Sequence, residues 1–255
     1  GGGPESRLPI IGAMGHKEAA TCRHDGVAWG YARSASTRGV EIHQHTEVKS
    51  LLRDKDGTIK GVETNRGTVL ANKVAVVVSG HTTTITETAG LRLPIKSFNL
   101  AAFVSEPVKP LIDVIVNCPD LGVYLNQSDK GELVIGGAPD PGQSFRRDVK
   151  QNVFEEAVVT MLELFPAFRR LKLLRQWGGV LDIAHDATPI ISATDIPGLF
   201  VSCGWWGGFK AVPAGGYTLA HLIATGQPHN VAAPFTLDRF HHLDFIVESG
   251  TTTAR

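Results

Sequence analysis

Apolar residues repeat every three to four positions in three parts of the chain, and this spacing predicts three helices. The first follows Asp25, which is a good N-cap residue. The second covers residues 149–165 and ends before Pro166. The third carries Pro213 in its first turn and stops at Gly226.

Alternating apolar and polar positions predict strands in two further regions. Residues 40–52, 59–64 and 68–71 are expected to form a three-stranded meander with short turns between the strands. A second set of strands is expected at 97–105, 114–116, 123–127 and 132–136. Because the helix at 149–165 follows this second set, the pattern indicates an α+β layer.

The run Val74–Val78 is continuously apolar and leads into Ser79 and Gly80. Such a run is typical of a strand that is buried on both faces of a parallel sheet. Ligands of these sheets bind beyond the carboxyl ends of the strands, so the pattern puts Gly80 at a candidate binding edge.

A glycine-rich turn follows a short strand expected at residues 198–202, and it contains two tryptophans and Lys210. Glycines let a flat or anionic ligand approach the backbone, and the N-terminus of the next helix offers free N–H groups with partial positive charge. The turn therefore suits an anion or an aromatic ring that gains negative charge on reduction. A close-packed turn with a solvated Lys210 fits the same spacing about equally well.

His24 lies just before the N-cap candidate Asp25 and beside Arg23. A neighbouring positive charge favours the neutral form of an imidazole, whose free ring nitrogen is nucleophilic. A surface histidine before a helix explains the pattern equally simply and is the better interpretation of these residues taken alone.

The balance of charges, the cysteines and the lengths of apolar runs argue against several classes of function. The 255 residues contain 25 basic and 25 acidic side chains, which argues against a nucleic-acid partner recruited by bulk charge. The three cysteines form no C-x-x-C pair, so we expect a reducing compartment and no metal site. No apolar run is long enough to span a bilayer, and residues 1–4 show no targeting pattern, so a cytoplasmic protein is expected.

Several motifs, in this order and spacing, resemble those of a known family. They are RHDGVAWGYAR at 23–33, VSEPVKP at 104–110, QSDKGELVIG at 127–136, ELFP at 163–166, LRQWGG at 174–179, and CGW at 203–205 with GFK at 208–210. Together they resemble the β subunits of heterotetrameric sarcosine oxidases, within the flavin-dependent D-amino-acid oxidase family. The resemblance extends from about residue 9 to about residue 240.

The resemblance implies an activity, two flavins and a set of partners. The activity is the oxidative demethylation of sarcosine, or a related N-methyl amino acid, to glycine. FAD is implied to bind noncovalently, and FMN is implied to be attached to His24, with Arg23 beside it. The implied partners are a large α subunit and small subunits of a hetero-oligomer, with no nucleic acid and no membrane.

The resemblance also implies roles for residues around the FAD ring. Gly80 and Gly204 belong to the implied cofactor site, and Gly207, Gly208, Phe209 and Lys210 match the stretch beneath the ring. The amine of Lys210 is implied to meet the substrate carboxylate, beside a helix N-terminus that stabilises the reduced ring. Tyr124 lies on the strand that lines the substrate pocket in related oxidases.

The expected fold is α/β plus α+β. Residues 1–91 and 177–255 are expected to form an FAD/NAD(P)-binding domain of glutathione-reductase type that lacks its N-terminal βαβ segment with the G-x-G-x-x-G turn. Residues 92–176 are expected to form a substrate domain around a mixed or antiparallel sheet. Such a chain should expose a sheet edge near Val74–Val78. Two details differ from relatives: Trp206 shortens the turn by one residue, and Gly179 stands where monomeric relatives attach FAD to a cysteine.

Two other functions remain open from the sequence. One is a different oxidoreductase of the same family, acting on dimethylglycine, glycine or a D-amino acid. The other is a noncatalytic assembly module that keeps the fold and a partner surface, with Lys210 and His24 as residues of no function.

Overall fold

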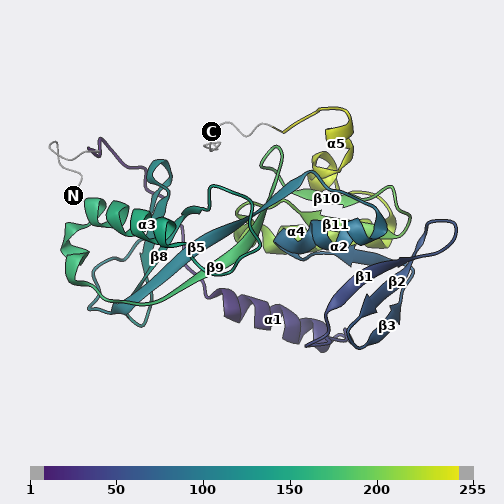
Figure 1. The fold of residues 1–255 in the computed structure, drawn as a ribbon, viewed down its shortest axis with the longest axis horizontal. Helices are drawn as coiled ribbons and strands as arrows, with labels where there is room; N and C mark the ends of the chain where they lie inside the picture. Colours follow the sequence, from purple (N-terminus) through teal and green to yellow (C-terminus); the bar gives the residue numbers. More distant parts are fainter. Residues whose placement is uncertain (1–8, 247–255) are drawn as a thin grey trace. The chain divides into compact units, whose positions relative to one another are not determined.

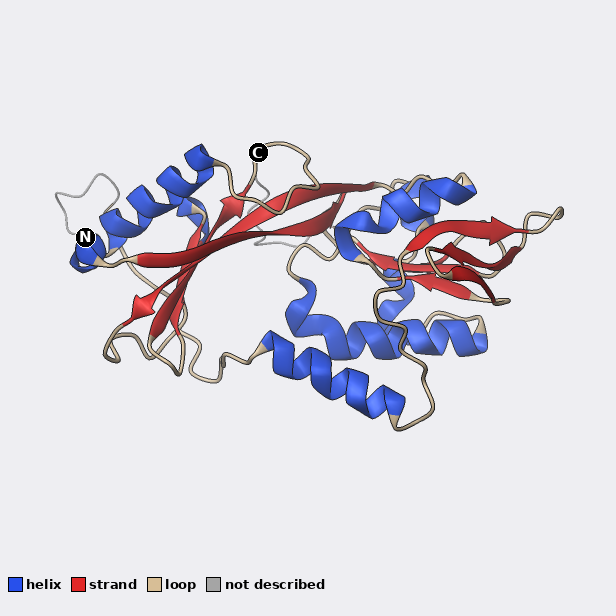
Figure 2. Cartoon of the chain, turned by 60° about the horizontal axis from the view of Figure 1, so that its bottom comes forward, coloured by secondary structure: helices blue, strands red, loops and turns tan. Residues whose placement is uncertain are grey.

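The computed structural model describes residues 9–246 (Figure 1). Residues 1–4, in which no targeting pattern was found, lie outside this range. The chain divides into two compact units. The first unit contains the segment up to residue 23 together with residues 99–180, and the second contains residues 24–98 and the segment from residue 181 onward. Both units combine helices with strands (Figure 2).

The first unit is built on a five-stranded sheet with the strand order β6-β7-β8-β5-β9. Its strands are β5 (Ile95–Pro107), β6 (Val116–Cys118), β7 (Val123–Gln127), β8 (Glu132–Pro139) and β9 (Leu173–Ala184). Residues 95–98 of β5 and 181–184 of β9 belong to the second unit. The ladders β6–β7, β7–β8 and β5–β8 are antiparallel. Helix α3 (Gln151–Leu164) packs on β7 and β8, and the 3₁₀ helices η3 (Pro119–Leu121) and η4 (Pro166–Arg170) complete the unit.

A single hydrophobic core joins the sheet of the first unit to α3. It contains Ala101, Phe103, Leu125, Leu133, Ile135, Val153, Ala157, Met161 and Phe168. The inward residues alternate along β7 and β8 and recur at helical spacing along α3, which is why these elements are readable from the sequence.

The second unit contains two small sheets. The meander β1-β2-β3 consists of β1 (Val48–Arg53), β2 (Ile59–Thr64) and β3 (Gly67–Leu70) (Figure 1). The other sheet has the order β10-β11-β4, formed by β10 (Ile190–Ala193), β11 (Leu199–Cys203) and β4 (Val74–Val76). β11 is antiparallel to β10 and parallel to β4.

The helices of the second unit pack on these sheets to different extents. They are α1 (His24–Ser36), α2 (Thr82–Thr86), α4 (Val212–Thr225) and α5 (Asp238–His241), with the 3₁₀ helices η1 (Ser79–His81), η2 (Glu87–Ala89), η5 (Gly208–Ala211) and η6 (Asn230–Phe235). α4 packs on β10 and β11 through Leu219 and Leu222. No residue of α1 is buried.

Two strand predictions and one cap prediction were wrong. The strand expected from residue 40 begins only at Val48, because the preceding residues turn at His45, whose φ is 56°. Val77 and Val78 are 55% and 46% exposed rather than buried on both faces, since β4 is an edge strand that stops at Val76. The exposed sheet edge expected near Val74–Val78 is confirmed. Helix α1 begins at His24, so Asp25 lies inside its first turn and does not precede it.

Candidate functional site

The carboxyl ends of β4 and β11 lie at one edge of their sheet. The two strands are parallel neighbours, with Val74 opposite Leu199 and Val76 opposite Val201. η1, which contains the buried Gly80, follows β4, and a turn leading into η5 follows β11. We call residues 79–81 and 204–211 the strand-end edge; ligands of parallel sheets bind in this position.

The backbone of the strand-end edge is unusual. Gly204 has a φ of 73°, and a Cβ atom on it would lie 2.7 Å from the Cβ of Ala184, so only glycine fits there. Ser79 and Trp206 have φ values of 48° and 52°, in the left-handed region that residues with side chains seldom occupy. Strained backbone of this kind collects at functional sites.

Asp182 lies directly behind the strand-end edge, and sequence reasoning missed it. Its side chain is buried, the hydroxyl of Ser79 donates to its Oδ1 at 2.9 Å, and the N–H of Gly204 donates to its Oδ2. Its backbone carbonyl accepts the N–H of Trp206 at 3.0 Å. The available signal was an acidic residue inside the apolar stretch 180–184.

Trp205 fills one side of the turn. Cβ atoms placed on Gly208 or Gly215 would each lie 2.7 Å from Trp205, so its side chain occupies the space that these glycines leave. Its indole N–H donates to the hydroxyl of Ser202 at 3.0 Å. The turn is therefore closed to a ligand on this side.

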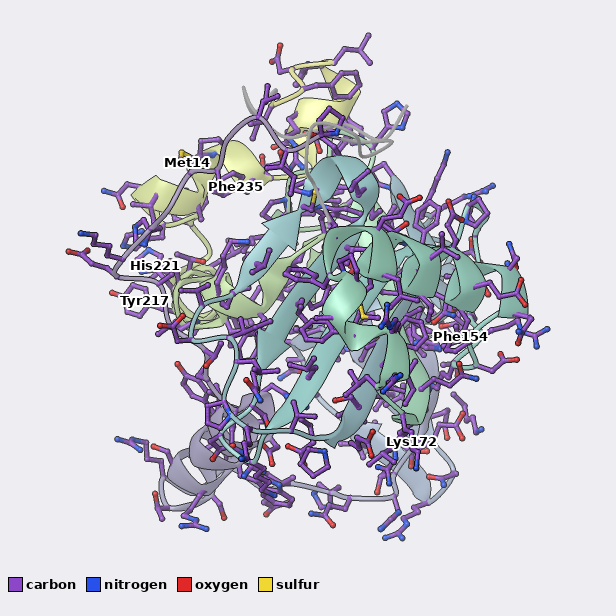
Figure 3. The ribbon with its side chains drawn as sticks, turned by 90° about the vertical axis from the view of Figure 1, so that its left-hand side faces the viewer. Met14, Phe154, Lys172, Tyr217, His221 and Phe235 are labelled. Atoms are coloured by element: carbon purple, nitrogen blue, oxygen red, sulfur yellow. The ribbon has the colours of Figure 1, made fainter. Side chains whose placement is uncertain are left out.

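The other side of the turn is open. Val212 and Gly216 are exposed, and a Cβ atom on Gly216 would meet nothing within 4 Å. Tyr217, labelled in Figure 3, is 65% exposed on the same helix. The N-terminus of α4, with its partial positive charge, is thus accessible next to the strand-end edge.

Lys210 supplies a full positive charge beside this helix end. It lies in η5, its side chain is exposed, and its amine donates to the carbonyl of Gly207 at 3.2 Å. Phe209 is also exposed. The site therefore combines a cation, an open helix N-terminus and backbone without side chains at Gly207 and Gly216. These features fit a planar ring that carries negative charge when reduced.

Cys203 ends β11 and is fully buried. Burial raises the pKa of its thiol, so the sulfur stays protonated and is no candidate nucleophile.

His24 is the first residue of α1, and its imidazole is exposed. Arg23 precedes it and is exposed as well. Asp25 follows, and its carboxylate accepts the N–H of Gly26 at 2.9 Å. Trp29 and Tyr31 of the same helix are exposed too, so α1 presents both aromatic and titratable groups to its surroundings.

Tyr124 belongs to the first unit, on β7 opposite Gly136 of β8. The ring lies over Gly136 so closely that a Cβ atom there would be 1.9 Å from it. Burial raises the pKa of the Tyr124 hydroxyl above its usual value, which keeps the group protonated and able to donate a hydrogen bond at neutral pH.

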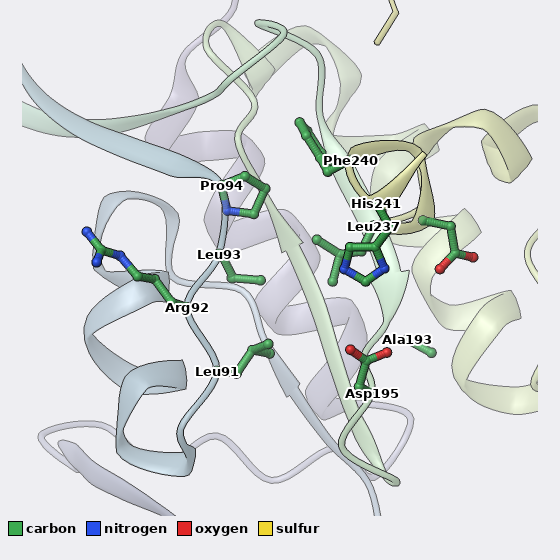
Figure 4. Close-up of a pocket in the computed structure, with 10 residues that line it drawn as sticks. Leu91, Arg92, Leu93, Pro94, Ala193, Asp195, Leu237, Phe240 and His241 are labelled. Atoms are coloured by element: carbon green, nitrogen blue, oxygen red, sulfur yellow. The ribbon is translucent and has the colours of Figure 1, made fainter. Parts of the chain in front are cut away.

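A cavity of about 410 Å³ lies elsewhere in the second unit, between the segments 91–94, 193–195 and 237–241 (Figure 4). It shares no residue with the strand-end edge. Leu93, Leu237 and Phe240 give it an apolar lining, and Asp195 and His241 add polar groups. None of the site residues predicted from sequence contributes to it.

Residues 9–246 contain neither a metal-binding cluster nor a membrane-spanning helix. The described part of the chain contains no cluster of three or more His, Cys, Asp or Glu side chains arranged to hold a metal ion. None of its helices combines the length and hydropathy needed to cross a membrane.

The fold and the strand-end edge agree with the family assignment. The chain belongs to the DAO family of FAD dependent oxidoreductases, whose family model matches residues 3–222. Its sequence is similar to proteins named sarcosine oxidase subunit beta. The relative from Rhodobacter capsulatus is 46% identical over 244 residues, which are 95% of this chain and 58% of the relative. Relatives from Rhizobium meliloti and Arthrobacter sp. are 44% and 43% identical, over 59% and 61% of their lengths.

Solved structures share the fold. L-proline dehydrogenase from P. horikoshii matches 85% of this chain with a TM-score of 0.78 and 26% identity, over 59% of its own chain. Glycine oxidase from Geobacillus kaustophilus matches 83% with a TM-score of 0.74 and 23% identity, over 56% of its own chain. The predicted resemblance and fold class are thus confirmed, and the chain spans about three fifths of the relatives that it matches.

Proposed function

We propose that this chain is part of the β subunit of a sarcosine oxidase and contributes the ring side of its FAD site. The observation that carries the proposal is the strand-end edge, where Lys210 and the open N-terminus of α4 meet. The similarity to sarcosine oxidase β subunits over 95% of the chain supports sarcosine as the substrate. FAD would bind noncovalently.

The residues of the strand-end edge would have different roles in binding FAD. FAD, when bound, supplies the acceptor for the hydride equivalent that leaves the N-methyl carbon of sarcosine. Gly80, Gly204, Gly207, Gly208 and Phe209 would shape the contact surface for the ring. The positive end of α4 would stabilise negative charge on the reduced ring.

Lys210 would hold the substrate. Its amine now donates to the carbonyl of Gly207, a single neutral acceptor, and a carboxylate is a stronger partner for an ammonium group. The second unit would act as the FAD-binding domain. The first would act as the substrate domain, where the protonated Tyr124 hydroxyl can donate to the substrate.

His24 would carry a second flavin, FMN, at the interface with a large α subunit. Its exposed imidazole and the exposed aromatic residues of α1 support an interface at this helix. The assembly would include small subunits and would work in the cytoplasm, in keeping with three cysteines that form no disulfide.

The substrate role of Lys210 is tested in the flavin-loaded assembly by comparing Lys210→Ala with Lys172→Ala, an exposed lysine of the first unit. We expect Lys210→Ala to raise the KM for sarcosine about tenfold or more while FAD content stays unchanged, because a charge-assisted bond to the carboxylate is lost. Lys172→Ala should change neither. Equal loss of FAD and of sarcosine binding would contradict the assigned role.

The FMN attachment is tested separately by mass spectrometry of the denatured chain. A mass increase equal to one FMN is expected, and it should disappear in His24→Gln and persist in His43→Gln, which alters another exposed histidine. An unmodified wild-type chain in the complete assembly would end this part of the proposal.

A different substrate within the family is the second candidate, favoured by the fold shared with a proline dehydrogenase. Lys210 could hold the carboxylate of any amino acid. Turnover with sarcosine, dimethylglycine, glycine, proline and a D-amino acid ranks the candidates by kcat/KM. An assembly module without catalysis would bind no FAD at all.

A further inference from the structure

We propose that Asp182 is a positioning residue that sets the shape of the strand-end edge for the flavin ring; this inference rests on the proposed function. The carboxylate joins the segments that follow β4 and β11, through Ser79 and Gly204. No other described carboxylate accepts hydrogen bonds from both segments.

The position of these contacts explains why an acid is needed. Parallel pairing of β4 with β11 ends at Val76 opposite Val201. Ser79 and Gly204 each lie three residues beyond this last pair, where no ladder hydrogen bonds join the two segments. The carboxylate of Asp182 therefore replaces the strand pairing at the point where the chain must open for a ligand.

Asp182 also reaches Lys210 through the backbone. Its carbonyl accepts the N–H of Trp206, and Gly207, the next residue, accepts the amine of Lys210. This link runs through the backbone of residue 182, whereas the carboxylate holds Gly204, two residues before Trp206.

Simple packing does not require this arrangement. A buried carboxylate costs free energy unless donors satisfy it, and both of its partners, Ser79 and Gly204, have positive φ values. An apolar residue at position 182 would fill the space between apolar neighbours without holding either turn. A polar group kept here at a cost is consistent with a site that must keep one shape.

Variants of Asp182 separate geometry from charge. In Asp182→Asn, the amide oxygen can accept from Gly204 and the amide nitrogen can donate to the hydroxyl of Ser79, so the turns should keep their shape. Asp182→Ala removes both contacts. Asp186→Ala is the matched control, because Asp186 is also a buried acid of the second unit but contacts Arg239, Thr188 and Ile246 and not the strand-end edge.

Hydrogen exchange tests the structural half on the purified chain. We expect the amide of Gly204 to exchange about tenfold faster in Asp182→Ala, and at nearly the wild-type rate in Asp182→Asn, since one hydrogen bond is worth about a factor of ten. The amide of Trp206 should exchange at nearly the wild-type rate in both variants, because it donates to the backbone carbonyl of residue 182, which both keep. Asp186→Ala should not change exchange selectively at these residues. Unchanged exchange of Gly204 in Asp182→Ala would overturn the inference.

FAD reconstitution of the complete assembly tests the functional half. Asp182→Ala should raise the Kd for FAD about tenfold and shift the visible spectrum of the bound flavin, and Asp182→Asn should restore the affinity. An equal rise in Kd for Asp186→Ala would mean that lost stability is the cause, and would refute the positioning role. If the wild-type assembly binds no FAD, the proposed function fails, whereas the exchange experiment still decides whether Asp182 holds the edge.

Discussion

Helix α3 of the first unit and helix α1 of the second differ in how completely they are buried. In the first unit, Phe103 and Leu133 are inaccessible and α3 buries its apolar face against the sheet. In the second unit, β11 is buried throughout, yet Val77 and Val78 after β4 are exposed and α1 buries nothing. Exposed apolar residues gathered in this way mark surfaces for ligands or partners, and the second unit is where the proposed cofactors bind.

One buried acid in each unit gives a second comparison, of how fully its carboxylate is satisfied. Asp186 of the second unit forms a two-pronged ion pair with Arg239, at 2.7 and 3.0 Å, and also accepts the N–H of Ile246. Asp140 of the first unit is equally buried, and the amine of Lys150 lies 2.8 Å from its Oδ2. Neither oxygen of Asp140 accepts a hydrogen bond of good geometry from the described residues. The carboxylate of Asp186 is therefore more completely satisfied than that of Asp140.

Breaking the Asp186–Arg239 pair should have the largest effect. Arg239→Ala leaves a buried carboxylate without its counter-charge and removes bonds to the carbonyls of Thr188 and Thr236. We expect it to lower the free energy of unfolding by about 3–5 kcal/mol, measured by urea denaturation. Arg146→Ala, which breaks the exposed pair with Asp148, is the control and should change the free energy of unfolding little, because water screens the pair. Similar losses of unfolding free energy in both variants would show that the buried pair contributes no more than the exposed pair.

Core truncation tests the comparison of apolar burial. Leu133→Ala in the first unit should cost about 2–5 kcal/mol, because the side chain is fully buried and a cavity remains. Leu70→Ala in the second unit should change stability by about 0.5 kcal/mol or less, since Leu70 is exposed on β3. A large loss for Leu70→Ala would show that the second unit buries this residue against another surface.

Because the carboxylate of Asp140 is incompletely satisfied, removing Lys150 and removing the charge of Asp140 should cost different amounts of stability. Lys150→Met leaves Asp140 buried without a cation and should cost about 1–3 kcal/mol. Asp140→Asn leaves Lys150, whose side chain is 39% exposed and can turn to water, and should cost about 1 kcal/mol or less. Chemical denaturation of both variants measures the difference; a reversed order would show that Asp140 has partners beyond Lys150.

The sequence predicted those elements whose signals are local. β7 was predicted to the residue, and α3 and α4 to within about two residues, because helical spacing is combined with Pro166 after one helix and Gly226 after the other. The exposure of Val77 and Val78 could not be predicted in this way. A continuous apolar run reports hydrophobicity, but it does not report which strand pairs with which.

The candidate site was predictable only in part, for the same reason. Lys210 and the glycines of the turn follow one another in the chain, so the motif is visible, although their roles stay predictions. Asp182 binds Ser79, 103 residues away, and Gly204, 22 residues away. No local pattern joins these three residues. The filling of the turn by Trp205 also depends on Gly215 of α4, one helical turn beyond the motif.

The smallest expected effect is a loss of folding stability at low pH, when Asp186 becomes protonated. Burial raises the pKa of Asp186, but the hydrogen bond and charge of Arg239 and the N–H groups of Ile246 and Thr188 outweigh it, so the pKa is lowered. The folded state then binds this proton less readily than the unfolded chain. The resulting stability is complete above the unfolded pKa of about 4 and is lost as the pH falls through the folded value. Wild type should lose this stability below about pH 4, and Asp186→Asn should not.

Asp148 makes this prediction sharper. The hydrogen bond from Arg146 lowers the pKa of its carboxyl to about 2, but this side chain is exposed. Water and salt screen such a pair, so Asp148→Asn should keep nearly the acid sensitivity of wild type. Urea midpoints compared between about pH 7 and pH 3 for both variants provide the measurement. If both variants lost the same share of the pH dependence of the urea midpoint, the paired charge would matter and its burial would not. That result would contradict the contrast between the buried and the exposed acid.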